Sequence, residues 1–86
     1  MIVLVPTQLQ SYTGGRSKVE ATGASVDEVL YDLDARYPGL RFRVIDEQDR
    51  IREHVRIFVA GETVENVAQV LSATDEVQIV GALSGG

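Results

Sequence analysis

The sequence contains no cysteine and a single histidine, His54. The missing thiols exclude disulfides, cysteine nucleophiles, sulfur carried on a side chain, and zinc or iron–sulfur sites built from thiolates. One imidazole is too few for a histidine cluster, so we expect no transition-metal site and no bound cofactor. A lone histidine at a strand edge is usually structural or solvated, and we assign no role to it.

Basic residues are also scarce. Eight lysines and arginines stand against 13 aspartates and glutamates, which gives a net charge of −5. Such a chain does not attract nucleic acid or an anionic membrane. The apolar run of residues 1–5 stops at Pro6 and follows no basic segment, so it is too short for a signal peptide or a transmembrane span. We therefore expect a cytoplasmic protein with no nucleic-acid or membrane partner.

The remaining composition is typical of a small globular domain. Hydrophobic residues make up 44% of the 86 residues and charged residues 24%, which is close to the average for globular proteins. A chain of this length buries roughly 60–65% of its unfolded surface, enough for one modest core but not for a deep substrate cavity as well. We expect one domain over residues 1–82 and a short tail over residues 83–86.

The first part of the chain predicts a β-hairpin. Residues 1–5 are apolar and end at Pro6, which has no N–H to donate to a neighbouring strand. Residues 7–16 are expected to form a loop or wide turn around Thr13-Gly14-Gly15, where glycine supplies the positive φ of a reversal. Residues 18–22 alternate polar and apolar side chains, which predicts a half-buried strand that returns antiparallel to the first.

The clearest helix signal begins at Ser25, a good N-cap, with Glu28 three residues later to complete a capping box. Pro38-Gly39 ends the helix. The next segment, residues 40–53, is dense in charges of both signs and is predicted to be a solvated crossover loop; binding of a partner is the less favoured alternative, because charged loops are commonplace. Within the helix, apolar residues at helical spacing form one stripe: Val26, Val29, Leu30, Leu33 and Tyr37.

Residues 54–60 and 76–83 are predicted to form two further strands, since both alternate along their length. Between them, Ala60-Gly61 predicts a tight type II turn with glycine at its third position. Residues 64–71 are apolar and weakly helical, and we expect a short turn there that covers the core.

This order of elements predicts an α+β fold. After a hairpin and a right-handed helical crossover, the last strand most easily pairs parallel to the first, in the middle of a mixed sheet of four to five strands. One main helix lies across one face of the sheet, which is the β-grasp (ubiquitin-like) arrangement. The strand residues expected to pack against that helix are Val3, Val5, Val19, Val55, Ile57, Val59, Val77 and Ile79.

The chain ends Leu83-Ser84-Gly85-Gly86, directly after the predicted last strand. Glycine has no β-carbon and takes almost any backbone conformation, so such a tail is thin and pliable. It can thread into the active site of another protein and present the carboxylate of Gly86 there. Two terminal glycines arise by chance in about one protein in two hundred, so the motif gains its weight from its place after a β-grasp strand.

The chain resembles the MoaD/ThiS family of ubiquitin-like sulfur carrier proteins, and within it the CysO-like branch, over essentially its whole length. Many members have Asn-Gly where this chain has Ala60-Gly61, and a proline where it has Gly81-Ala82-Leu83, but neither difference touches the terminal glycines. The residues that carry the resemblance are Pro6-Thr7 with Leu9, Thr13-Gly14-Gly15, residues 32–39 at the helix end, the strand over residues 55–59, and Ser84-Gly85-Gly86.

The resemblance implies a specific chemistry. An E1-like enzyme uses ATP and magnesium to adenylate the carboxylate of Gly86, while Ser84 and Gly85 thread its active site. A sulfur donor then displaces AMP and leaves a thiocarboxylate, and a downstream enzyme of a cysteine, molybdopterin or thiamin type pathway accepts the sulfur. The carrier supplies no catalytic side chain, so it is not expected to be an enzyme.

The predicted partner-binding face lies on the side of the sheet that the helix leaves open. An apolar cluster on such a face often marks a protein interface, with polar residues at its rim. The alternative is that these are scattered surface residues, which are normal in globular proteins. The predicted face consists of Leu4, Phe58, Val80, Ala82 and Leu83, with Arg56 as its polar rim.

Other interpretations remain open at this point. Gly86 joined to a lysine of a target protein would make the chain a ubiquitin-like modifier, and both routes begin with the same acyl-adenylate. The domain would instead be a non-covalent interaction module if the terminal glycines were incidental. An enzyme is the weakest interpretation, because no nucleophile–base pair is visible and Asp32 and Asp34 do not share a helix face. We expect the chain to be monomeric on its own.

Overall fold

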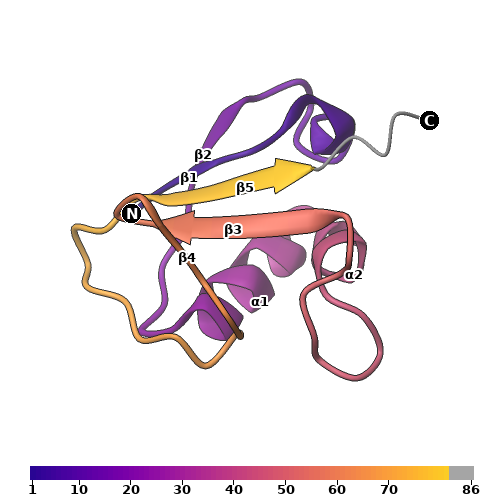
Figure 1. The fold of residues 1–86 in the computed structure, drawn as a ribbon. Helices are drawn as coiled ribbons and strands as arrows, with labels where there is room; N and C mark the ends of the chain where they lie inside the picture. Colours follow the sequence, from indigo (N-terminus) through magenta and orange to yellow (C-terminus); the bar gives the residue numbers. More distant parts are fainter. Residues whose placement is uncertain (82–86) are drawn as a thin grey trace.

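The computed structural model describes residues 1–81. Its elements are β1 (Ile2–Leu4), the 3₁₀ helix η1 (Thr7–Leu9), β2 (Lys18–Glu20), α1 (Val26–Arg36), α2 (Leu40–Val44), β3 (Val55–Val59), β4 (Glu62–Thr63) and β5 (Val77–Gly81). The strands form one mixed sheet in the order β2-β1-β5-β3-β4, and α1 lies across one face of it (Figure 1). The predicted α+β, β-grasp fold is confirmed.

Strand β5 runs through the centre of the sheet. It pairs parallel to β1, with Val3 opposite Val77, and antiparallel to β3, with Ile57 opposite Ile79. Strands β2 and β4 pair antiparallel to β1 and β3 and form the two edges. The predicted parallel pairing of the last strand with the first is therefore confirmed, and β5 ends between η1 and the start of β3 (Figure 1).

The core lies between α1 and the sheet. The core is built from aliphatic side chains, and burying one of them stabilises the fold by about 1.5–3 kcal/mol. The capping box forms at the start of α1: Glu28 N–H donates to Ser25 Oγ at 3.2 Å, and Ala24 N–H donates to Glu28 Oε1 at 3.1 Å. The helix stripe is buried at Val26, Val29, Leu30 and Leu33, and so are all eight strand residues expected to face it: Val3, Val5, Val19, Val55, Ile57, Val59, Val77 and Ile79.

The prediction of a solvated loop over residues 40–53 is wrong for its first part. Residues Leu40–Val44 form α2, and Leu40, Val44 and Ile45 are completely buried. Leu40 and Val44 lie four positions apart and so share one face of the helix. Three buried apolar residues among many charges are enough to hold this short helix against the core, while Phe42, Arg43 and most of the hairpin that follows are exposed.

The turn after β3 also differs from the prediction. Ala60 has φ of 52° and Gly61 has φ of 82°, so both central residues are left-handed. Two positive φ values define a type I′ turn rather than type II, and the type I′ turn matches the twist of a two-residue hairpin. The hairpin places Val59 opposite Glu62 and thereby adds β4, the fifth strand.

The segment between β4 and β5 covers the core without forming a helix. Val64 and Leu71 are buried, as a covering turn requires, whereas Val70 is 75% exposed. Within residues 1–81, no helix is long and apolar enough to cross a membrane.

Candidate partner-binding surface at the end of the central strand

The structure describes the strand that leads into the tail, but not the tail itself. The predicted site residues Ala82, Leu83, Ser84, Gly85 and Gly86 lie outside the described residues, and their roles remain predictions. What the structure provides is the platform from which these residues extend, which ends at Gly81.

Gly81 is held from both sides. It lies opposite Val55 of β3 in the sheet. On the other side, Gln8 Nε2 donates a hydrogen bond to the carbonyl oxygen of Gly81 at 3.4 Å. A β-carbon at position 81 would come within 3.1 Å of Gln8 Cδ, so glycine allows this side chain to lie against the end of the strand. The last described residue is thus fixed by sheet pairing and by one side chain of η1.

The open face of the sheet carries the described part of the predicted partner-binding face. Leu4, Phe58 and Val80 are half-buried there, and Arg56 is exposed. Gln78 lies opposite both Leu4 and Phe58, one on each side, so it separates them. Val80 is the diagonal neighbour of both. The structure therefore brings the three apolar residues together around one amide side chain, and their role in binding remains a prediction.

Arg56 lies opposite Val80, near the end of β5. Its Nη1 donates to the carbonyl oxygens of Glu53 at 2.9 Å and Val55 at 3.0 Å. These bonds fold the side chain back along β3, toward the end of the molecule where β5 leaves the sheet. Arg56 is thus placed where a polar rim of the open face was predicted.

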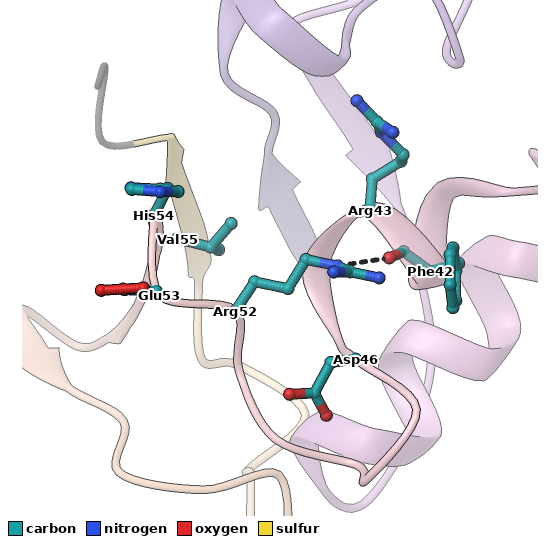
Figure 2. A pocket seen from close by; sticks show the side chains of 7 residues that line it. All are labelled: Phe42, Arg43, Asp46, Arg52, Glu53, His54 and Val55. Atoms are coloured by element: carbon teal, nitrogen blue, oxygen red, sulfur yellow. Dashed lines mark hydrogen bonds between the residues drawn. The ribbon is translucent and has the colours of Figure 1, made fainter. Parts of the chain in front are cut away.

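A second surface at this end of the molecule was not predicted. A cavity of about 540 Å³ opens between α2 and the start of β3. Arg52 spans it, because its Nε donates to the carbonyl oxygen of Phe42 at 2.7 Å and its guanidinium carbon lies 4.6 Å from the centre of the Phe42 ring (Figure 2). The cavity is lined by Phe42, Arg43, Asp46, Arg52, Glu53, His54 and Val55.

One of the two acidic residues in this lining, Asp46, is already engaged. Asp46 accepts hydrogen bonds from the backbone N–H groups of Arg50 at 3.0 Å and Gln48 at 2.9 Å, and the Arg50 guanidinium lies 3.7 Å away. The backbone hydrogen bond from Arg50, followed by that from Gln48, holds the pKa of Asp46 below its usual value. Asp46 therefore stabilises the hairpin over residues 45–51 rather than offering a free carboxylate to the cavity.

We find no group of three histidine, aspartate or glutamate side chains within residues 1–81 that is close enough to hold a metal ion.

Comparison with known proteins places these features in context. The sequence matches the family model described as the ThiS family over residues 3–86. The sulfur carrier protein CysO of Mycobacterium tuberculosis is 34% identical over 89 residues, which cover 98% of this chain and 96% of that protein. Its crystal structure superposes with a TM-score of 0.90 at 32% identity and covers 95% of this chain and 98% of that one.

Two other solved structures are similar. A chain in the Amycolatopsis orientalis BexX/CysO complex has a TM-score of 0.92 and 31% identity, with coverage of 99% of this chain and 98% of that one. SAMP1 of Haloferax volcanii has a TM-score of 0.78 and 26% identity, with coverage of 100% and 98%.

Proposed function

The chain belongs to the ThiS family and is a sulfur carrier protein, and from this premise we propose that it carries sulfur as a thiocarboxylate on Gly86. The family and the sulfur-carrier function agree with those predicted from the sequence. One observation supports this position of the sulfur: the family match extends through Gly86, the last residue of the segment that follows the central strand β5 in the sequence.

In the proposed cycle, an E1-like enzyme binds ATP and magnesium and admits Ser84 and Gly85 into its active site. The carboxylate oxygen of Gly86 attacks the α-phosphorus of ATP and expels pyrophosphate. A sulfide-level donor then attacks the acyl carbon and expels AMP, which leaves the thiocarboxylate. Adenylation is needed because a carboxylate is a poor electrophile without a good leaving group. The carrier contributes only its terminal carboxylate, as the substrate, and the partner supplies the catalytic groups and binds ATP and magnesium, so in this cycle the carrier itself is no enzyme and binds no cofactor.

The relatives also suggest where the sulfur goes. The CysO chain of Amycolatopsis orientalis was crystallised in complex with BexX. We propose that this chain also docks on a partner protein, that this partner accepts the sulfur in the cytoplasm, and that a cysteine-type pathway is the first one to test. The domain over residues 1–82 would provide the docking surface, and residues 83–86 would deliver the sulfur.

Intact-mass measurement after alkylation tests the proposal. The chain is incubated with ATP, magnesium, a sulfur source and an E1-like enzyme, and is then treated with a thiol-alkylating reagent. Alkylation is needed because oxidation of Met1 adds almost the same mass as the exchange of oxygen for sulfur. The chain has no cysteine to react, so we expect one alkyl group, localised to Gly86.

A variant with tryptophan added after Gly86 is the control, because it keeps the domain but blocks the terminal carboxylate. It should remain unalkylated and keep the same melting temperature. Similarity to a small archaeal modifier protein keeps conjugation as the second candidate function. Lysine-linked adducts without alkylation, alongside a carrier that works as a positive control, would favour conjugation and contradict sulfur transfer.

The open face is tested separately with Phe58→Asp. A carboxylate in place of this half-buried ring is expected to weaken binding to the activating enzyme at least tenfold. Because Phe58 points away from α1, the free energy of unfolding should fall by no more than about 1–2 kcal/mol. Titration calorimetry and urea denaturation measure the two effects. Unchanged affinity would remove Phe58 from the interface.

A further inference from the structure

The length of the tail limits how far the activating enzyme can lie from β5. Five residues follow Gly81, and at about 3.3–3.6 Å per residue they span at most about 18 Å. A specific interface buries about 800 Å² on each partner, so an enzyme that takes in Gly86 must cover the surface around Gly81. Val55 lies opposite Gly81 and also lines the cavity between α2 and β3. That cavity therefore lies beside the surface that the enzyme covers.

The side chain that most resembles an interface residue in this cavity is Phe42. It is 54% exposed, although its helix is otherwise anchored by completely buried residues. Aromatic residues and arginine are enriched at the energetic centres of protein interfaces. The stacked guanidinium of Arg52, fixed through its Nε to the Phe42 carbonyl, holds the pair in one arrangement before any partner arrives. Such preorganisation lowers the entropy lost on binding.

The lining of the cavity carries two guanidinium groups, Arg43 and Arg52, and two carboxylates, Asp46 and Glu53. Five of the eight basic residues of the chain, but only four of its 13 acidic residues, lie between residues 41 and 56. Within residues 1–81, Arg43 and Arg52 make no ion pair. The side chain of Glu53 points away from Phe42 (Figure 2). The charge of Arg52 is close enough to Asp46 to help lower the pKa of that carboxylate, so Arg52 is partly compensated, and Arg43 is the more available guanidinium on the side of the cavity formed by α2.

From these observations we propose that the cavity docks an acidic, partly apolar surface segment of the activating enzyme. A carboxylate of that segment would pair with the guanidinium groups of Arg43 and Arg52, and an apolar side chain would lie on Phe42. We name these three residues the α2–β3 corner. The proposal rests on the proposed function, and it names the activating enzyme because sulfur transfer and conjugation both begin with it. The corner would orient the docked domain, in addition to the open sheet face.

The test measures kcat/KM for thiocarboxylate formation by the activating enzyme, with the carrier as the varied substrate. Phe42→Ala is matched by Tyr31→Ala, because Tyr31 is 56% exposed and has an arginine 4.2 Å from its ring centre, but does not line the cavity. Arg43→Ala is matched by Gln69→Glu, because both change the net charge from −5 to −6. Gln69 lies at the N-terminal end of α1, where its carbonyl oxygen accepts the N–H of Val26.

We expect each corner variant to lower kcat/KM about tenfold, with kcat at saturating carrier unchanged, and each control to stay within twofold. Phe42→Tyr, which keeps the ring, should retain activity, and the effect of Arg43→Ala should shrink at about 1 M salt, where charges are screened. All variants should keep the melting temperature of the unchanged chain within a few degrees, since the four varied positions, Tyr31, Phe42, Arg43 and Gln69, are all exposed.

Three results would overturn the proposal. If corner variants and controls behave alike while the unchanged chain forms a thiocarboxylate, the corner has no docking role and the proposed function stands. If the corner variants are activated normally but deliver sulfur slowly, the corner belongs to the accepting enzyme instead. If the unchanged chain forms no thiocarboxylate, the proposed function fails, and the docking role fails with it.

Discussion

Replacing Arg41 with methionine is expected to destabilise the fold by about 1.5 kcal/mol, because this arginine ties three elements together. Arg41 Nη2 lies 2.9 Å from Asp27 Oδ1 of α1 and 3.2 Å from Asp49 Oδ1 of the hairpin. Its guanidinium carbon lies 4.2 Å from the centre of the Tyr31 ring, and its side chain is only 14% exposed. Methionine keeps the length of the apolar stem and removes the charge.

The magnitude follows from the environment of each contact. The partly buried hydrogen bond to Asp27 contributes about 1.5 kcal/mol. The bond to Asp49 contributes about 0.5 kcal/mol, because that carboxylate is 71% exposed, and stacking on Tyr31 adds about 0.5 kcal/mol. Against them, Arg41 Nε is buried with no hydrogen-bond partner among the described residues, a cost of about 1 kcal/mol that methionine relieves.

Arg41 is charged under all conditions in which the protein folds. Burial lowers the pKa of Arg41, but the hydrogen bonds to Asp27 and Asp49 together raise it by more than burial lowers it. The pKa therefore lies above the usual value for arginine. The loss in Arg41→Met should therefore be nearly independent of pH wherever both aspartates are ionised.

Urea denaturation followed by circular dichroism measures the effect. The expected loss lowers the urea midpoint by about 0.5–1.5 M and the melting temperature by about 6–12 °C. Arg36→Met is the control, because Arg36 is 46% exposed, pairs with Asp32 on the same helix and donates to the carbonyl oxygen of Glu20 at the exposed edge of the sheet; it should lose no more than about 1 kcal/mol. Equal losses in the two variants, or a gain in Arg41→Met, would show that desolvation cancels the Arg41 contacts.

Two further predictions concern the hairpins. Asp46 has a lowered pKa in the folded state, so its stabilisation is present above the unfolded pKa of about 3.9 and is lost as pH falls through the folded pKa. Asp46→Asn should therefore destabilise the protein to urea at pH 7 but not at about pH 2; a loss of equal size at both pH values would contradict the role of the charge. Ala60→Asn should stabilise the fold by about 0.5–1 kcal/mol, since asparagine tolerates the left-handed φ of 52° better than alanine. Ala73→Asn, at an exposed position outside that turn, should give no gain, and equal melting temperatures for all three chains would refute the strain argument.

The elements predicted correctly are those whose signal is local. The stripe from Val26 to Leu33 repeats at helical spacing behind a capping box, and the inner residues of β3 and β5 alternate without interruption. Each pattern is complete within one element, so it specifies that element without reference to the rest of the chain. The strand order then followed from the handedness of the crossover.

The elements predicted wrongly depend on contacts between distant residues. Leu40, Val44 and Ile45 lie in a highly charged stretch that has no clear helical spacing, and it is burial against the core that makes residues 40–44 helical. Ala60 takes a left-handed conformation that alanine disfavours, because the twist of β3 and β4 selects a type I′ turn.

The candidate site divides in the same way. The terminal glycines could be found from the sequence, because they directly follow the predicted last strand. Phe58 and Val80 could be assigned to the open face, because side chains alternate between the two faces along β3 and β5. The cavity could not be found, because it exists only where Arg52 folds back onto Phe42, ten residues earlier in the chain. No periodicity links these two positions.

The pairing of β5 with a strand on each side has a mechanical consequence. An enzyme that draws on the chain end pulls along the axis of β5, whose hydrogen bonds to β1 and β3 run across the direction of that pull. These bonds are loaded together in shear and must break together, unlike those of a hairpin that is peeled open one bond at a time. Val77 and Ile79 would also have to leave the core before the strand could slide. An unfoldase that pulls on this end of the chain would therefore act first on the most mechanically resistant part of the domain. The same resistance allows a partner to apply force to the chain end without unfolding the domain.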